Sequence, residues 1–377
     1  MSKTLKFLVV PDKFRGSLSA SQAAHAIKMG ILSEAKDAQI SEYTLTDGGD
    51  GFVDTISKAV QGSKVIRLKT IDPTGQVLTA KCALLDDDTA LIGLTEASGI
   101  NLVSDTERKP SKLTNVGTGQ ILEKLVERGY KSIIIGVGGS ATNDGGIGLL
   151  APLGFKFLDK DGNEIQPNGE GLGLLDKVVA PDKKFNVKFT VATDVDAKLL
   201  GKNGASLCYS LAKGADEKEA QILEQNMKNL VEVAKKCGFK SAHDEAGAGA
   251  AGGCGYGLMT FLGAKRVSGF DVFAKYVGLE ALIKNCNVVI TGEGKFDATD
   301  TQGKGPYALA KLASKYKKPV WIFCGSSPLS QKEIDAMGIP NMKVAQILPL
   351  APNLIEAQNR APKFLSHLSK EFVKEIL

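Results

Sequence analysis

Glycines alternate with hydroxyl, amide and carboxylate side chains in the eleven-residue stretch from Gly136 to Gly146. The stretch follows a run rich in β-branched residues, Ser132–Ile135, and precedes an apolar segment, Ile147–Leu153. This order predicts a strand, a turn and the start of a helix. Glycine lets a backbone approach a ligand closely, and N–H groups at a helix start attract anions. Glycine alone would predict only a turn, whereas this mixture predicts a phosphate or metal–phosphate site.

Two further segments place carboxylates beside glycines or at a strand end. The segment Asp47–Gly51 holds three glycines and two carboxylates, more than a plain turn needs. Asp194 and Asp196 follow the expected strand Lys188–Ala192. Carboxylates at the carboxyl end of a strand suit Mg²⁺ or a general base. A turn or a helix cap is the structural alternative for both segments.

Two loops carry basic side chains. Lys13 and Arg15 lie in the strand-to-helix loop Pro11–Ser19, where they could hold a carboxylate or a phosphate. The segment Thr291–Asp297 follows another expected strand and combines acidic residues with the nearby Lys304, a mixture that suits a magnesium-bound nucleotide. Solvated turns are the alternative for both loops.

Other patterns are weaker or missing. The residues from Gly136 to Ala141 formally fit the dinucleotide fingerprint, but Thr142-Asn143-Asp144 is untypical of the helix that should follow. Gly247–Gly253 also contains G-x-G-x-x-G, but polar residues precede it, so a close-packed or anion-contacting loop is predicted. No P-loop or protein-kinase motif occurs. The three histidines lie in unrelated contexts, so acidic residues are expected to do the proton and metal work.

Composition indicates a globular chain with room for two domains, since 377 residues include 43% hydrophobic and 24% charged residues. The net charge of +5 is spread out, which disfavours nucleic acid as a partner. No apolar run reaches the length of a membrane span, so a cytoplasmic protein without membrane contact is expected. Six widely spaced cysteines favour free thiols over a metal site or disulfides.

The hydrophobic pattern alternates between strand and helix at both ends of the chain. Ser19 and Gln22 predict a capping box at the start of the first helix. The expected strands span residues 5–10, 42–45, 65–71, 77–84, 89–95, 132–135, 188–192, 206–212, 288–291, 320–324 and 342–348. The expected helices span residues 20–31, 52–60, 120–128, 217–236, 308–316 and 354–377, with another starting near 147.

This order predicts an α/β protein of two domains. Residues 1–62 and 284–377, from both chain ends, are expected to form a Rossmann- or flavodoxin-like parallel-sheet domain. Residues 63–283 are expected to form an inserted α/β domain with a mixed sheet and the glycine-rich loops, because the middle begins with an antiparallel meander.

Taken together, these segments resemble the class I glycerate kinase family of bacteria. Gly-Gly-Ser-Ala-Thr-Asn-Asp-Gly-Gly is specific in combination with Gly-Ala-Gly-Ala-Ala-Gly-Gly and Thr-Gly-Glu-Gly. The resemblance implies two α/β domains, one inserted in the other. It also implies transfer of the γ-phosphoryl group of ATP to D-glycerate with Mg²⁺, with 2-phosphoglycerate favoured over 3-phosphoglycerate as the product. The matching stretches are 11–20, 47–51, 134–150, 194–206, 247–262 and 288–305, in the family's order over essentially the whole chain.

On this resemblance we assign hypothetical roles. Asp194 is the general base on the glycerate hydroxyl or a Mg²⁺ ligand, and Lys13 and Arg15 are catalytic residues that hold the glycerate carboxylate or the transferring phosphoryl group. The expected substrate- or phosphate-binding residues are Ser17, Asp47, Gly138, Gly139, Ser140, Thr142, Asn143 and Asp144. The expected nucleotide-binding residues are Gly292, Glu293, Gly294 and Lys304, and the expected metal ligands are Asp194, Glu293 and Asp297.

The chain departs from the family pattern at several positions. Arg15 stands where the family usually has Lys, and Asp50 where it usually has Glu; Ala197-Lys198 and Thr299-Asp300 also differ. These departures leave a non-catalytic sensor of a small acid as one alternative. The dinucleotide-like pattern leaves a NAD-dependent hydroxy-acid oxidoreductase as another. Assembly into a homodimer is also left open.

Overall fold

The computed structural model describes residues 4–298 and 305–377, and the chain divides into two compact units. One unit comprises Met1–Thr46 and Phe273–Leu377, and the other comprises Asp47–Val272. The predicted boundaries at 62/63 and 283/284 therefore need correction. Helix α2 (Phe52–Ala59) packs on strands of the second unit, so the chain leaves the first unit before α2. The second boundary falls inside helix α8 (Gly269–Val277).

The first unit contains a five-stranded sheet in the order β13-β12-β11-β1-β2, in which every pairing is parallel. Phe7, Leu8 and Val9 of β1 are all buried, as in strands of a parallel sheet that is covered on both faces. The strands are β1 (Lys6–Val9), β2 (Gln39–Glu42), β11 (Val288–Lys295), β12 (Val320–Ser326) and β13 (Met342–Gln346).

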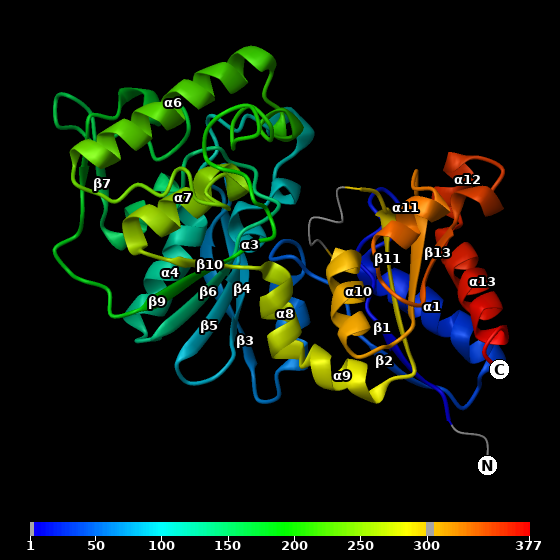
Figure 1. The fold of residues 1–377 in the computed structure, drawn as a ribbon. Helices are drawn as coiled ribbons and strands as arrows, with labels where there is room; N and C mark the ends of the chain where they lie inside the picture. Colours follow the sequence, from blue (N-terminus) through cyan, green and yellow to red (C-terminus); the bar gives the residue numbers. More distant parts are fainter. Residues whose placement is uncertain (1–3, 299–304) are drawn as a thin grey trace. The chain divides into compact units, whose positions relative to one another are not determined.

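Helices cover both faces of this sheet. Helices α1 and α13 pack on each other on one face, and α10 lies on the other face against β11 and β12 (Figure 1). The predicted capping box is present at the start of α1, where Ser19 and Gln22 bind each other's backbone N–H groups. The helices of this unit are α1 (Ala20–Glu34), α9 (Leu279–Asn285), α10 (Gly305–Lys315), α11 (Gln331–Ala336), α12 (Leu354–Asn359) and α13 (Ala361–Lys374).

The second unit contains a six-stranded mixed sheet in the order β10-β9-β6-β5-β4-β3. The predicted meander is confirmed, since β3–β4 and β4–β5 are antiparallel pairs, whereas β5, β6, β9 and β10 pair in parallel. These strands are β3 (Lys64–Ile71), β4 (Val77–Leu84), β5 (Thr89–Gly93), β6 (Ser132–Gly136), β9 (Lys188–Ala192) and β10 (Lys265–Val267). The predicted fold class, an all-parallel unit beside a mixed-sheet unit, is therefore confirmed.

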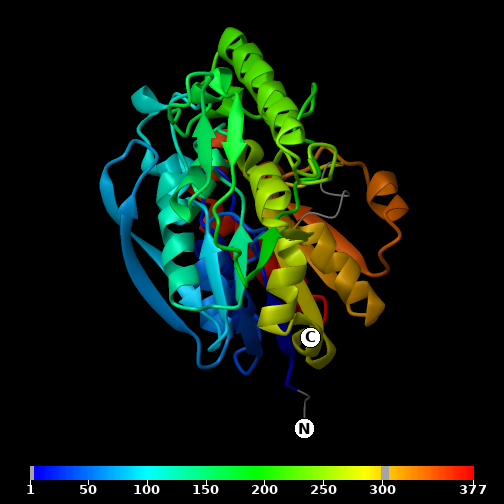
Figure 2. The ribbon, with the colours of Figure 1, turned by 90° about the vertical axis from the view of Figure 1, so that its left-hand side faces the viewer.

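The longest helix of this unit is α6 (Glu217–Lys236). Figure 2 shows α6 at the end of the unit away from the mixed sheet, where it contacts β8 of the short pair β7 (Lys156–Leu158) and β8 (Lys177–Val179). The remaining helices are α2, α3 (Thr95–Ser98), α4 (Val116–Glu127), α5 (Ile147–Leu150) and α7 (Ala250–Leu262).

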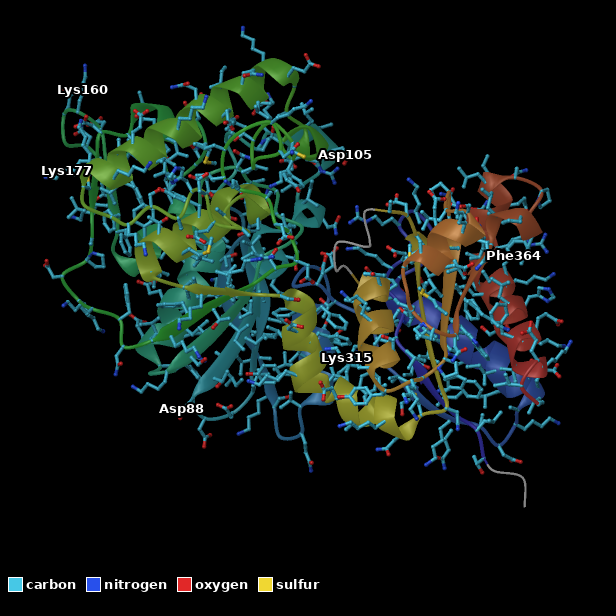
Figure 3. All side chains as sticks on the ribbon, in the orientation of Figure 1. Asp88, Asp105, Lys160, Lys177, Lys315 and Phe364 are labelled. Atoms are coloured by element: carbon cyan, nitrogen blue, oxygen red, sulfur yellow. The ribbon has the colours of Figure 1, made fainter. Side chains whose placement is uncertain are left out.

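Charged side chains lie on the outside of this unit. Lys160 and Lys177, on and beside the β7–β8 pair, are exposed and extend outward (Figure 3). Asp88 is exposed at the amino end of β5, the edge of the sheet opposite the glycine-rich loops. The acidic turn around Asp88 therefore serves as a turn, not as part of the candidate site.

Two predicted strands are wrong. Residues 206–212 form turns and the start of a short 3₁₀ helix, Leu211–Lys213, and not a strand. The strand expected at 42–45 lies at Gln39–Glu42. The segment 354–377 is largely helical, as predicted, but it forms two helices divided at Arg360, because Pro362 starts a new helix more readily than it continues one.

Candidate active site

The parallel strands of the second unit bring three polar loops to one edge. β6 and β9 end in register, with Gly136 beside Ala192, and β10 pairs with β9 through Val267 beside Ala192. The loops after these strands begin at Val137, Thr193 and Ser268. Ligands of open α/β sheets bind at the carboxyl ends of parallel strands, so this edge is the candidate site of the unit.

The segment Asp47–Gly49 crosses this edge in close contact with the strand ends. A Cβ on Gly48 would lie 2.5 Å from the carbonyl oxygen of Ala192, and one on Gly136 would lie 2.5 Å from that of Gly48. A Cβ on Gly269 would overlap the carbonyl of Asp47. Glycine is therefore required at several points of this crossing, which places the exposed Asp47 at the carboxyl edge.

Asp194 is held by two donors from the loop after β10. Its carboxylate accepts from the Ser268 hydroxyl at 2.6 Å and from the Phe270 backbone N–H at 3.0 Å. Burial raises the pKa of Asp194 to about 6, the Ser268 and Phe270 hydrogen bonds oppose that rise, and the nearby Asp47 adds to it. A carboxylate that titrates near neutrality at a strand end can accept a proton from a substrate hydroxyl.

Three successive backbone N–H groups follow β6. In the described part of the chain, the N–H groups of Gly138, Gly139 and Ser140 donate no hydrogen bond to the protein. Gly139 has a φ of 62°, in the left-handed region, and Gly138 and Gly139 are the accessible residues of the glycine-rich stretch. Successive N–H groups around a left-handed residue form concavities that bind anions.

The polar side chains that follow are buried and bind the protein. Thr142, Asn143 and Asp144 have no exposed surface. Asp144 accepts from the Asn115 amide at 2.8 Å and from the Gly146 N–H at 2.9 Å, and burial raises its pKa to about 6. Asn143 is bonded to Ala205 and Ser206. These side chains hold the stretch in place beneath Gly138 and Gly139.

Lys213 lies in the same buried layer. Its ammonium group donates to the Ser140 hydroxyl and to the Thr142 carbonyl, both at 2.7 Å. Only 8% of the residue is exposed. Burial lowers the pKa of Lys213 to about 8, against the opposing influence of Cys254 and Asp144. Sequence reasoning did not identify this lysine.

The second glycine-rich segment packs against the first. Gly252 has a φ of 67°, and its carbonyl accepts from the Gly145 N–H at 3.0 Å. A Cβ on Gly253 would lie 2.7 Å from the Cα of Gly145. The close-packed loop predicted for Gly247–Gly253 is observed, and contact of this loop with an anion stays a prediction.

In the first unit, the basic loop lies at the carboxyl ends of β1 and β11. The Asp12 N–H donates to the Gly292 carbonyl at 2.8 Å, and the ring of Phe14 is buried against Gly292. Phe14 and Leu18 exchange two backbone hydrogen bonds of 2.9 Å, which close the loop. This tight turn leaves Arg15 exposed and Lys13 half-buried.

The other predicted residues of this unit lie nearby. Ser17 donates from its hydroxyl to the Gln358 carbonyl at 2.6 Å. Arg15, Ser17 and Gly294 line a cavity of about 70 Å³ at the carboxyl ends of β11 and β12. Glu293 is half-buried, and Asp297 pairs with Lys295 at 2.9 Å. Lys304 and Thr299-Asp300 lie outside the described residues.

Each unit therefore gathers its own predicted residues at the carboxyl ends of its parallel strands. The second unit brings together Asp194, Asp47 and the Gly138–Ser140 backbone, and the first unit brings together the basic loop and Gly292–Gly294. Sequence reasoning missed Lys213, Asn115 and Ser268. The only sequence signal for Ser268 was the glycine that follows it, because the strand before it has only three residues.

Polar loops at the carboxyl ends of two parallel-strand systems define an α/β enzyme that binds small molecules. A family model described as the glycerate kinase family matches residues 7–377. A glycerate kinase from Bacillus subtilis is 35% identical, covering 99% of this chain and 98% of the relative. The glycerate 2-kinase of Escherichia coli is 40% identical, covering 85% of each chain.

A crystal structure of a candidate glycerate kinase 2 from Salmonella typhimurium LT2 has a similar fold. Its TM-score is 0.77 at 30% identity, covering 99% of this chain and 98% of that one. The chain belongs to the glycerate kinase family. It is therefore a kinase, and the two alternatives, a non-catalytic sensor and a NAD-dependent oxidoreductase, are not supported. The dinucleotide-like pattern fails structurally as well, because the next helix starts at Ile147, well after Ala141.

Across the described residues, no helix is both long and apolar enough to cross a membrane.

Proposed function

We propose that this kinase transfers the γ-phosphoryl group of ATP to the 2-hydroxyl of D-glycerate, with Mg²⁺. The proposal depends on one observation: Asp194 and the N–H groups of Gly138–Ser140, which donate to no described residue, follow the adjoining, in-register ends of β9 and β6. The carboxylate of Asp194 can accept a hydroxyl proton, and the N–H groups of Gly138–Ser140 can bind an oxyanion. The name of the Escherichia coli relative, glycerate 2-kinase, supports the 2-position.

Phosphoryl transfer asks a protein mainly for positioning and neutralisation of charge. Asp194 would accept the proton of the glycerate hydroxyl, or would bind the metal instead. Lys13 and Arg15, in the loop after β1, would hold the glycerate carboxylate or the transferring phosphoryl group. The guanidinium of Arg15 offers two parallel donors to such a group, which a lysine at this position would not.

The donor set fits a magnesium ion that is carried by the nucleotide. Within residues 4–298 and 305–377, no cluster of three potential metal-binding side chains occurs. Mg²⁺ in such enzymes is held by one or two carboxylates together with substrate phosphates, and it would neutralise phosphate charge. Asp194 in one unit, or Glu293 and Asp297 in the other, would supply those carboxylates.

The product can be identified without purification. The protein is incubated with ATP, Mg²⁺, D-glycerate and enolase, and phosphoenolpyruvate is measured. Enolase acts on 2-phosphoglycerate, so we expect phosphoenolpyruvate to form directly, and none when D-glycerate is omitted. If it forms only after phosphoglycerate mutase is added, the 2-position is wrong. Absence of ATP consumption in the presence of D-glycerate, with or without the mutase, would contradict the proposed reaction.

The pKa of Asp194 makes a prediction about pH. Because the folded-state pKa is raised to about 6, kcat/KM should fall as pH drops through about 6, where the base becomes protonated. Ser268→Ala removes a hydrogen bond that stabilises the charged form of Asp194. The pH at which kcat/KM falls on the acidic side of its profile should therefore be higher in this variant. The measurement is kcat/KM against pH for both proteins; a fall at the same pH in both would exclude Asp194 as its source.

A further inference from the structure

We propose that Lys213 is a positioning residue that orients the Ser140 hydroxyl as a donor to an oxyanion of the bound substrates. This inference rests on the proposed function and extends it to a residue that lies outside the candidate site. Lys213 is separated from Ser140 by 73 positions in the sequence, but its ammonium group lies 2.7 Å from the Ser140 hydroxyl oxygen.

The direction of this hydrogen bond follows from chemistry. An ammonium group has three donors and no acceptor, so the Ser140 oxygen must be the acceptor. The Ser140 hydrogen then has to point away from Lys213. Within the described residues, the Ser140 hydroxyl makes no other hydrogen bond. Ser140 is only 3% exposed, so its hydroxyl can donate to a ligand only where that ligand binds directly against the Gly138–Ser140 run.

The position of Ser140 gives the class of that acceptor. Ser140 is the last residue of the Gly138–Ser140 run, whose three N–H groups donate to nothing in the described part of the chain. A hydroxyl donor beside successive free N–H groups suits an oxyanion. A carboxylate oxygen of glycerate and a phosphoryl oxygen share that chemistry, and either one would satisfy the site.

Other groups of the buried layer hold Lys213 in place and oppose the lowering of its pKa by burial. A second bond, to the Thr142 carbonyl at 2.7 Å, ties the ammonium group to the same stretch. Asp144, fully buried, lies close enough to favour the charged lysine. A buried charge is tolerated when it is hydrogen-bonded and near an opposite charge. The cation also lies in a buried layer, where screening is weak, so it attracts an anion at Gly138–Ser140 more strongly than a surface lysine would.

The test compares Lys213→Met with Ser140→Ala and with the double variant. Each single variant should lower kcat/KM about 10–100-fold, the range expected for losing a charge-assisted hydrogen bond. The double variant should be no worse than the poorer single one, because Lys213 acts through Ser140. Additive losses would overturn the proposal, and so would wild-type kcat/KM in Lys213→Met.

The matched control is Ser206→Ala. Ser206 donates to the Asn143 side chain at 3.0 Å, so this variant removes a buried bond of the same stretch without touching Ser140. We expect its kcat/KM to stay within about threefold of wild type, below the effect of losing a charge-assisted bond. A loss equal to that of Lys213→Met would show that Lys213 only stabilises the loop. If Lys213→Met is insoluble, Lys213→Gln, which keeps an amide donor without charge, takes its place.

Two readouts identify the oxyanion. If Ser140 binds the glycerate carboxylate, Lys213→Met should raise KM for D-glycerate and weaken its binding in calorimetry without ATP, with kcat retained. If it binds the transferring phosphoryl group, kcat should fall while D-glycerate binding is unchanged. The enolase assay on wild-type protein tests the proposed reaction separately from the role of Lys213. A negative result there contradicts the reaction, whereas calorimetry with D-glycerate still tests the role of Lys213.

Discussion

Asp194→Asn is expected to lower kcat by roughly 10²–10⁴-fold, the usual contribution of a positioned general base. Asparagine keeps the shape of the side chain but cannot accept the hydroxyl proton. It also places an amide NH₂ where the carboxylate accepts from Ser268 and Phe270. The measurement is steady-state kcat with D-glycerate and ATP.

Asp196→Asn is the matched control. Asp196 lies two residues further along the same loop, is exposed, and pairs with Arg266. We expect near-wild-type kcat from this variant. Wild-type-like turnover in Asp194→Asn would exclude Asp194 from the proposed role. A magnesium titration separates its two candidate roles, because excess Mg²⁺ should restore activity only if Asp194 is a metal ligand.

Stability should respond in the opposite sense to activity. The folded-state pKa of Asp194 is raised above the ordinary value of 3.8 to about 6, so the folded state binds the proton more tightly than the unfolded state. Its contribution to stability is therefore lost as pH rises from about 4 through 6. The contribution of Asp194 to the Tm should therefore be smaller at pH 7 than at pH 4, and thermal unfolding of wild type and Asp194→Asn at the two pH values measures it.

The strands could be predicted because they are buried on both faces. Phe7–Val9 and Ile133–Ile135 are continuous apolar runs bounded by turn residues, and both form parallel strands. Asp194 and Gly138 could be proposed for the same reason, since each follows directly on a recognisable strand. The fold class and the local part of the site are therefore properties of short sequence windows.

The rest of the site depends on contacts between distant segments. Residues 206–212 have the composition of a strand, but Leu211 is 45% exposed and Lys213 only 8%, the reverse of the usual order. That reversal exists because Lys213 finds Ser140 and Thr142, which no local pattern can indicate. Ser268 reaches Asp194 only through the pairing of β9 with a strand of three residues.

The second large effect is expected from Gly48→Ala, which should destabilise the second unit and lower kcat/KM. Gly48 has a φ of 96°, which costs an alanine about 1–2 kcal/mol. The new Cβ would also lie 2.5 Å from the carbonyl oxygen of Ala192, at the end of the strand that precedes Asp194. Relieving that overlap must move backbone, at about 1–3 kcal/mol.

Gly51→Ala is the control within the same loop. Gly51 also has a positive φ, 77°, but its Cβ would meet nothing closer than Thr55 at 4.0 Å. Both variants place an alanine at a positive φ, so the difference in stability between them measures the effect of the overlap at the strand end. At roughly 2–4 °C per kcal/mol for a unit of this size, Gly48→Ala should lose several degrees more of Tm than Gly51→Ala.

Activity should separate the two variants further. A displacement of about 1 Å at a reacting group can cost about 10²-fold in rate, so kcat/KM of Gly48→Ala should fall 10–100-fold while Gly51→Ala stays within a few-fold. Thermal unfolding and kcat/KM would be measured on both proteins. Equal losses of Tm and kcat/KM in the two variants would mean that position 48 needs glycine only for its left-handed backbone conformation. The packing of Asp47–Gly49 across the ends of β6 and β9 would then not require it.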